Sequence, residues 1–106
     1  MALKPLVFEI LLALVDEPRH GWSLVREVES RLGGEPLLPG NFYRTLRRML
    51  ADDLIKEAPR GRAQGDEPRR RYFELTARGE HFARDEARRL AALVSDARTR
   101  KLLKAR

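Results

Sequence analysis

Residues 39–50 read PGNFYRTLRRML, and this stretch decides the fold. Pro39 suits the first turn of a helix, and Phe42, Leu46 and Met49 recur at the i, i+4, i+7 spacing of a single helical face. At about 100° per residue, the other side chains of this helix turn outward. The outward set is Gly40, Asn41, Arg44, Arg47, Arg48 and Ala51. We therefore predict a helix running to about residue 52, with one apolar and one cationic face.

Two further helices are expected upstream of this one. Pro5 suits a first helical turn, and residues 6–15 are apolar almost throughout, which is typical of a helix enclosed by others. A second helix follows Gly21 and stops at the glycine pair 33–34. Because only residues 33–38 separate the second helix from the third, the two have the short connection of a helix-turn-helix pair, which ordinary helical hairpins share.

A hairpin is predicted downstream. Residues 55–59 and 69–75 are strand-like and flank residues 60–68, which are rich in Gly, Pro and charge. Phe73 shares a strand face with Leu75 and is assigned to the core, whereas Tyr72 stays a weaker candidate for stacking on bases. The hairpin carries more arginines than acids, so it has net positive charge. The arginines are Arg60, Arg62, Arg69, Arg70 and Arg71.

Thr76 is a good N-cap for a last helix, interrupted only by Gly79 in its first turn. Apolar residues at 4-3-4-3 spacing predict a stripe along it. A helix of about 25 residues is roughly 38 Å long, so its own domain can cover only part of the stripe. We expect pairing with the same helix of a second subunit, with intramolecular packing as the alternative. The expected dimerisation set is Ala83, Ala87, Leu90, Leu93, Val94 and Ala97, with Leu103 broadening the stripe.

The predicted fold class is therefore mainly α with a small β-hairpin. Residues 1–75 form a winged helix-turn-helix domain, and residues 76–106 form a C-terminal dimerisation helix.

Charge and composition narrow the function. The chain has 22 Lys and Arg against 16 Asp and Glu, a net charge of +6, and nearly all the basic residues are arginine. Arginine favours bidentate contacts with phosphates and bases, so an acidic polymer is the natural partner. A protein whose charged surface is only solvated would have a similar composition. Cysteine is absent, which excludes disulfides and thiolate metal sites and fits the cytoplasm. The apolar run at residues 6–15 is interrupted by Glu9 and is too short to span a bilayer, so no membrane association is expected.

Enzymatic patterns are not found. His20 and His81 lie far apart and belong to no metal-ligand pattern, and His81 with Asp85 reads as a solvated pair. There is no glycine-rich phosphate loop and no nucleophile elbow. We expect no catalytic residues, no metal and no cofactor.

The outward face of residues 39–51 suits duplex DNA, because a major groove admits one helix in which arginine reads guanine and asparagine reads adenine. Asp52 and Asp53 lie at the end of this helix, where we expect them not to mask the arginines. Tyr43, on the flank, either reaches a phosphate or only packs. The expected DNA-binding set is Gly40, Asn41, Tyr43, Arg44, Arg47, Arg48, Arg62, Arg69, Arg70 and Arg71. Alternatives left open are a small-molecule sensor, a protein-docking adaptor and an RNA binder that uses Tyr72.

Four stretches together resemble the PadR family of bacterial repressors. They are PRHGW at 18–22, PGNFYRTL at 39–46, DLI at 53–55 and PRRRYFELT at 68–76. The resemblance implies a homodimer joined through the last helix, a palindromic operator, and repression relieved by a small molecule or another signal that the sequence does not identify.

Three positions depart from the family pattern. Leu38 stands where a serine or threonine usually caps the third helix. Asp53 replaces a glycine at a position that favours the left-handed conformation. Trp22 replaces a tyrosine, and an aromatic ring there is expected to pack at the helix junction; a role in ligand binding stays open.

Overall fold

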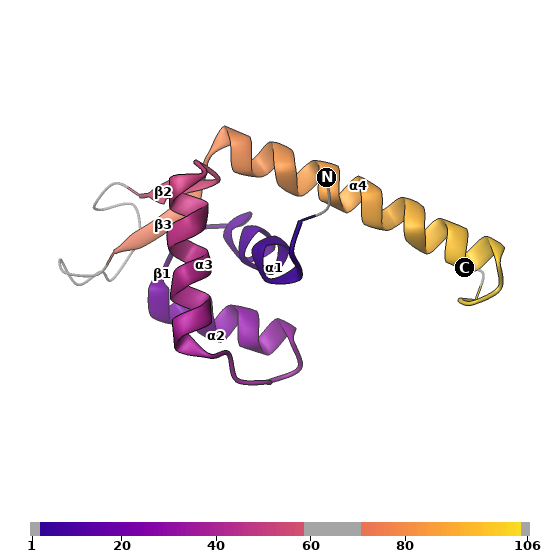
Figure 1. Cartoon of the computed structure of the whole chain (residues 1–106), viewed down its shortest axis with the longest axis horizontal. Helices are drawn as coiled ribbons and strands as arrows, with labels where there is room; N and C mark the ends of the chain where they lie inside the picture. The colour runs from indigo at the N-terminus through magenta and orange to yellow at the C-terminus, as the bar shows by residue number, and fades with distance from the viewer. Residues whose placement is uncertain (1–2, 59–70, 105–106) are drawn as a thin grey trace.

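The computed structural model describes residues 3–58 and 71–104. Within these ranges, helices surround a short sheet, and the last helix projects well beyond the rest of the molecule (Figure 1). The elements in chain order are α1 (Pro5–Leu14), β1 (Arg19–His20), α2 (Gly21–Arg31), α3 (Pro39–Ala51), β2 (Ile55–Glu57), β3 (Tyr72–Leu75) and α4 (Ala77–Thr99). The predicted fold class, a winged helix-turn-helix with a long last helix, is confirmed.

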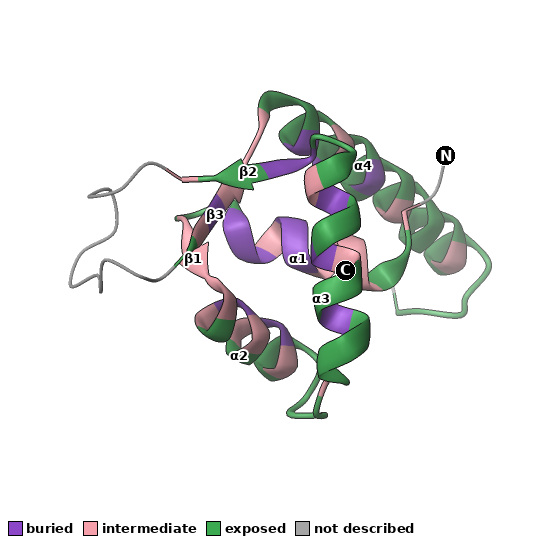
Figure 2. Cartoon of the chain, turned by 60° about the vertical axis from the view of Figure 1, so that its left-hand side comes forward, coloured by how far each residue is buried: buried purple, intermediate pink, exposed green. Residues whose placement is uncertain are grey.

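The hydrophobic core is built around α1, which lies between α2, α3 and α4 (Figures 1 and 2). Ile10 and Leu11 of α1 are fully buried, as the apolar run predicted. The other helices and the sheet each add side chains to the same cluster, among them Leu24, Val28, Phe42, Leu46, Met49, Ile55, Phe73 and Ala83.

The sheet has three strands in the order β1-β3-β2, all antiparallel. The predicted hairpin is present as β2 and β3, with Ile55 opposite Leu75. The strand β1, in which Arg19 pairs with Phe73, was not predicted. A strand of two residues has no periodicity to detect, but it ties the start of α2 to the wing.

The helix termini differ in how they are capped. Thr76 Oγ1 accepts a hydrogen bond from the Gly79 amide at 2.9 Å, as predicted for an N-cap. Leu38 gives α3 no side-chain cap, which confirms the loss expected from the sequence. His20 caps α2, which was not predicted: its Nδ1 accepts a hydrogen bond from the Ser23 amide at 3.2 Å.

The end of α3 is held by the start of α4. Asp53 has a φ of 61°, the left-handed conformation foreseen at this position. The backbone carbonyls of this turn accept hydrogen bonds from α4 and from its N-cap residue. Arg78 Nε donates to Asp52 O at 3.0 Å, and Thr76 Oγ1 donates to Asp53 O at 2.6 Å. The Thr76 amide donates to Leu54 O at 3.2 Å. These bonds satisfy carbonyls that a helix end would otherwise leave free.

Gly79, expected only as a helix breaker, marks the closest approach in this junction. It is buried, and a Cβ added to it would lie 2.0 Å from the carbonyl oxygen of Leu54. Only a residue without a side chain allows α4 to pass so close to the turn that follows α3.

Glu86 is a buried carboxylate that was not predicted, with 4% of its surface exposed. Arg89 donates to both of its oxygens, at 2.9 and 2.7 Å. These hydrogen bonds, helped by the Leu3 amide, lower the pKa of Glu86 although burial opposes the shift. The residue thus stays charged and attaches the segment before α1 to α4.

We predict that Gly79→Ala destabilises the protein by about 2–3 kcal/mol, because the new methyl group must push α4 away from a backbone carbonyl. Urea unfolding of the purified chain measures the change in stability. Gly40→Ala is the matched control: nothing lies within 4 Å of its added Cβ, so stability should stay the same or rise. Equal stability of both variants would contradict a tight crossing at Gly79.

Candidate nucleic-acid interface

The orientation of α3 is fixed by its buried face. Phe42, Leu46 and Met49 are buried in the core, as the spacing predicted. Every residue of the predicted outward set is exposed: Gly40, Asn41, Arg44, Arg47, Arg48 and Ala51. The helix therefore presents its arginines on the surface opposite the core, and Figure 2 shows this exposed side of α3.

The arginines of α3 differ in their partners. Arg48 Nε lies 3.5 Å from Asp52 Oδ2, so the expectation that Asp52 leaves the arginines unmasked is wrong for Arg48. The pair is loose, because 80% of the Arg48 side chain remains exposed. Within residues 3–58 and 71–104, neither Arg44 nor Arg47 forms an ion pair. Their charges are available to a ligand.

Tyr43 lies on the flank of α3 and is exposed. Its ring packs edge-on against Phe42, with centroids 5.3 Å apart. Its hydroxyl lies beside Gly21: a Cβ added to Gly21 would be 3.5 Å from the Tyr43 hydroxyl oxygen. The ring thus packs while the hydroxyl stays at the surface next to the start of α2, an arrangement that fits both roles considered for this residue.

A cleft of about 470 Å³ separates α3 from the wing, and we call it the α3 cleft. It is lined by His20, Gly21, Trp22, Tyr43, Leu46, Arg47, Leu50, Arg71 and Phe73. None of these described lining residues is acidic, and two are arginines. The cleft can therefore accept an anion.

Trp22 stands at the mouth of this cleft with 62% of its surface exposed. The prediction that it packs at the helix junction is wrong. The guanidinium carbon of Arg26 lies 6.0 Å from its ring centroid. The ring is therefore available at the surface beside α3.

In the wing, Arg71 is already engaged. Its Nη2 donates to Glu57 Oε2 at 2.9 Å, and its guanidinium lies 5.7 Å from the Phe73 ring centroid. Arg60, Arg62, Arg69 and Arg70 lie outside the described residues. Phe73 is in the core, as expected, and Tyr72 is half-buried with its ring edge-on to His20 at 5.3 Å.

The stripe on α4 divides into two parts. Ala83 is buried in the core of its own chain, so for this residue intramolecular packing replaces the expected contact with a second subunit. Farther along, Leu90 and Ala97 are half-buried and Ala87 is exposed. Leu93 exposes 54% of its surface, and Val94 and Leu103 are also exposed. The second part of the stripe is thus only partly covered by its own chain.

Other types of site find no support in the described part of the chain. Residues 3–58 and 71–104 contain no group of three or more His, Cys, Asp or Glu side chains arranged to hold a metal ion. His81 and Asp85 form an exposed pair at 3.2 Å, as predicted. No helix among the described residues is both long and apolar enough to cross a membrane.

Three helices with a short turn between the second and third, followed by a β-hairpin, define a winged helix-turn-helix protein. Residues 10–85 match the model of the "Transcriptional regulator PadR-like family". The chain therefore belongs to the PadR family, and it is a DNA-binding transcriptional regulator.

Several solved structures share the fold. A PadR-like transcriptional regulator from Bacillus cereus has a TM-score of 0.76 at 21% identity, covering 95% of this chain and 93% of that one. A PadR family regulator from Clostridium difficile has a TM-score of 0.74 at 24% identity, with coverages of 94% and 100%. A PadR-like factor from Bacteroides fragilis has a TM-score of 0.71 at 23% identity, with coverages of 89% and 87%. At these identities the likeness shows the fold. Among curated proteins, none matches the sequence.

The hydrogen bond from Arg71 lowers the pKa of Glu57. We predict that Arg71→Gln raises the pKa of Glu57 toward its ordinary value, because the charged donor that favours the carboxylate is removed. An NMR titration of the Glu57 side chain measures the change. Arg47→Gln is the control and should leave the pKa of Glu57 where it is in the unmodified chain. A Glu57 pKa that is the same with and without Arg71 would show that the pair does not persist in solution.

Proposed function

We propose that the protein is a homodimeric repressor that binds a palindromic operator. The observation that carries this proposal is the arrangement of α3. Its buried face turns Arg44 and Arg47 outward together, and neither forms an ion pair with the part of the chain that the structure describes. In the proposed complex, the α3 helices of two protomers enter successive major grooves about 34 Å apart. Arg44, Arg48 and Asn41 contact base edges, and Gly40 lets the helix start approach the DNA closely.

Contacts with the DNA backbone hold α3 in register. Tyr43 and Arg47 border the α3 cleft. A phosphate in this cleft would meet the Tyr43 hydroxyl and the Arg47 guanidinium, and none of the described lining residues is acidic. Arg71, on the wing side of the cleft, exchanges Glu57 for a phosphate. Arg62, Arg69 and Arg70 of the wing contact the flanking backbone or minor groove.

The homodimer forms through α4. Support comes from the second part of the stripe, where Ala87, Leu93 and Val94 are exposed and Leu90 and Ala97 are half-buried, so that an apolar surface is left for a partner. Two such surfaces related by a two-fold axis cover each other, which also matches the symmetry of a palindromic site. The resemblance to the family's repressors supports repression that is relieved by a small molecule or another signal, and the absence of cysteine supports action in the cytoplasm. A dimer across two grooves excludes other proteins from the DNA it covers.

For the DNA contacts, fragments selected from random DNA at physiological salt define the operator. We predict that Arg44→Ala weakens operator binding by about 1–3 kcal/mol, while binding to unrelated DNA falls less, because the side chain that reads the base is gone. Arg47→Ala should weaken both DNAs alike and reduce the salt slope by about 0.9 for each phosphate that is no longer neutralised. Binding titrations at several salt concentrations measure both effects.

The control for these variants is Arg88→Ala on α4, which is exposed and far from α3 and should leave DNA binding unchanged. If Arg44→Ala and Arg47→Ala weaken operator and unrelated DNA equally, the division into base and phosphate contacts is wrong.

For the dimer, we predict that Leu93→Glu converts the protein to a monomer, because it places a charge in the centre of the apolar interface. Sedimentation equilibrium over a range of concentrations measures the change. Ala92→Glu is the matched control: its position points to the opposite side of α4, so it should still form dimers. A dimer that tolerates both substitutions equally would place the interface elsewhere.

A further inference from the structure

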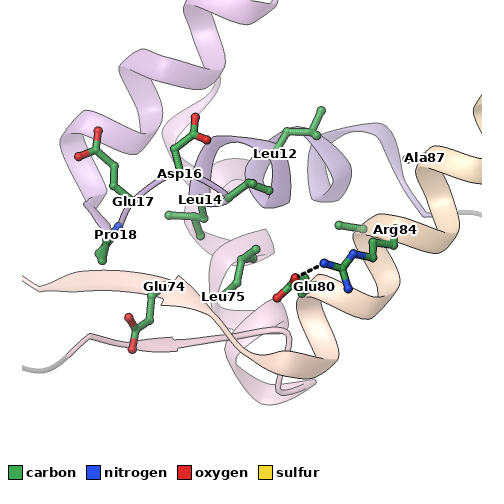
Figure 3. A pocket seen from close by; sticks show the side chains of 12 residues that line it. Leu12, Leu14, Asp16, Glu17, Pro18, Glu74, Leu75, Glu80, Arg84 and Ala87 are labelled. Atoms are coloured by element: carbon green, nitrogen blue, oxygen red, sulfur yellow. Dashed lines mark hydrogen bonds and ion pairs between the residues drawn. The ribbon is translucent and has the colours of Figure 1, made fainter.

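Leu38, the residue before α3, is an apolar side chain with 76% of its surface exposed. Other exposed apolar residues of the described chain border a concave site: Trp22 and Tyr43 line the α3 cleft, and Val15 lines a pocket of about 430 Å³ between α1, β3 and α4 (Figure 3). Leu38 lines neither of these sites. Its exposed surface therefore needs a separate explanation.

The backbone around Leu38 is held in one conformation. A residue that precedes proline is restricted to extended backbone, and Leu38, before Pro39, has a φ of −72° and a ψ of 118°. Glu29 Oε2 accepts a hydrogen bond from the Leu37 amide at 2.8 Å, and the Phe42 amide donates to Leu38 O at 3.0 Å. The position of the Leu38 side chain is thus fixed from both sides.

Leu37 and Leu38 turn in opposite directions. Successive side chains alternate along an extended segment. Leu37 is partly buried and packs against the hydrophobic core, so Leu38 faces away from it. The packing that anchors this turn therefore also presents a leucine at the surface.

Leucine gives α3 no benefit as its N-cap residue. The Leu38 side chain forms no capping hydrogen bond, whereas a serine at this position could accept one from a free amide of the first turn. With most of its surface exposed, Leu38 also buries little apolar area in its own chain. Stability therefore gives no reason for leucine at this position.

The surroundings of Leu38 belong to the proposed DNA interface. Figure 1 shows that α3 begins at the end of the helix that lies away from α4. Asn41 is exposed one turn after Leu38, and nothing lies within 4 Å of a Cβ added to Gly40. In helix-turn-helix proteins, the first residues of the recognition helix contact base edges. A base pair can therefore approach Leu38 without obstruction from the described part of the chain.

An aliphatic side chain in the major groove has one specific partner. Leucine neither donates nor accepts hydrogen bonds, and the apolar group that a base edge presents in this groove is the C5 methyl group of thymine. Residues three apart on a helix have Cβ atoms about 5–6 Å from each other, and successive base pairs are about 3.4 Å apart. The thymine would thus lie within about two base pairs of the base that Asn41 contacts.

We propose that Leu38 contacts the C5 methyl group of one thymine in each half-site of the operator; this rests on the proposed function of α3. Arg44, Arg48 and Asn41 supply hydrogen bonds to the bases, and Leu38 adds a preference for a methyl group. Leu38 is therefore a specificity-determining residue of the interface.

Uracil tests this contact, because it differs from thymine only in lacking the methyl group. Each thymine of the selected operator is replaced in turn, in both half-sites, and binding titrations measure the dissociation constants. At one position the unmodified chain should bind about fourfold less tightly for each methyl group removed. Leu38→Ser should bind the thymine and uracil operators equally at that position, since its side chain no longer reaches the methyl group.

Two controls keep this result interpretable. Urea unfolding should show that Leu38→Ser is at least as stable as the unmodified chain, because serine can cap α3. Val15→Ser makes the same kind of change at an exposed residue of the pocket in Figure 3, and no residue of α2 or α3 lines that pocket. This variant should keep the fourfold difference between thymine and uracil.

The outcomes separate the Leu38 contact from the proposed function. If no selected sequence binds better than unrelated DNA, both are wrong. If Arg44→Ala weakens operator binding, but uracil has no effect at any thymine or Leu38→Ser keeps the difference, α3 still reads the operator and the Leu38 contact is wrong. An operator with no thymine within about two base pairs of the base that Asn41 contacts would overturn it as well.

Discussion

Burial of Phe42, Leu46 and Met49 is the constraint on which the rest of the structure depends. Truncating any one of these side chains to alanine costs about 2–5 kcal/mol of stability. That is a large share of the free energy of unfolding of a small domain, which is about 5–15 kcal/mol. Rotating α3 about its axis would expose all of them at once, so the helix has one permitted orientation. Because residues advance by about 100°, that orientation also fixes Arg44 and Arg47 on the surface. The cationic face is thus a consequence of the packing behind it.

The junction between α3 and α4 extends this constraint to the other end of the molecule. Arg78 and Thr76 bind the carbonyls that α3 leaves free, and Gly79 lets α4 pass against Leu54 without a side chain between them. A contact between backbones leaves little room for adjustment, since no flexible side chain lies in the gap. The helix proposed to form the dimer is therefore rigidly joined to the helix proposed to contact DNA.

Features that follow from local periodicity or capping were predictable from the sequence. The two faces of α3, the Thr76 cap and the core position of Phe73 belong to this group, whereas the left-handed turn at Asp53 was expected from the resemblance to the PadR family. Features that depend on distant contacts were not. β1 exists because β3 lies beside it, and the buried Glu86 is bound by the amide of Leu3, which is distant in the sequence. The pair of Arg48 with Asp52 was readable, because i, i+4 spacing puts both on one face. The exposure of Trp22 was not predicted, because nothing nearby in the sequence shows whether another helix covers its ring.

The length and rigidity of α4 determine how the two halves of the protein can influence each other. In the proposed dimer, the register of α4 against its partner sets the separation of the two α3 helices, because the junction at Gly79 transmits the position of one helix to the other. A shift of one residue along α4 moves the attached domain by about 1.5 Å and rotates the contact face by about 100°. Such a shift would move α3 out of register with successive major grooves. A signal that alters α4 pairing therefore needs no contact with the DNA-facing surface to release the operator.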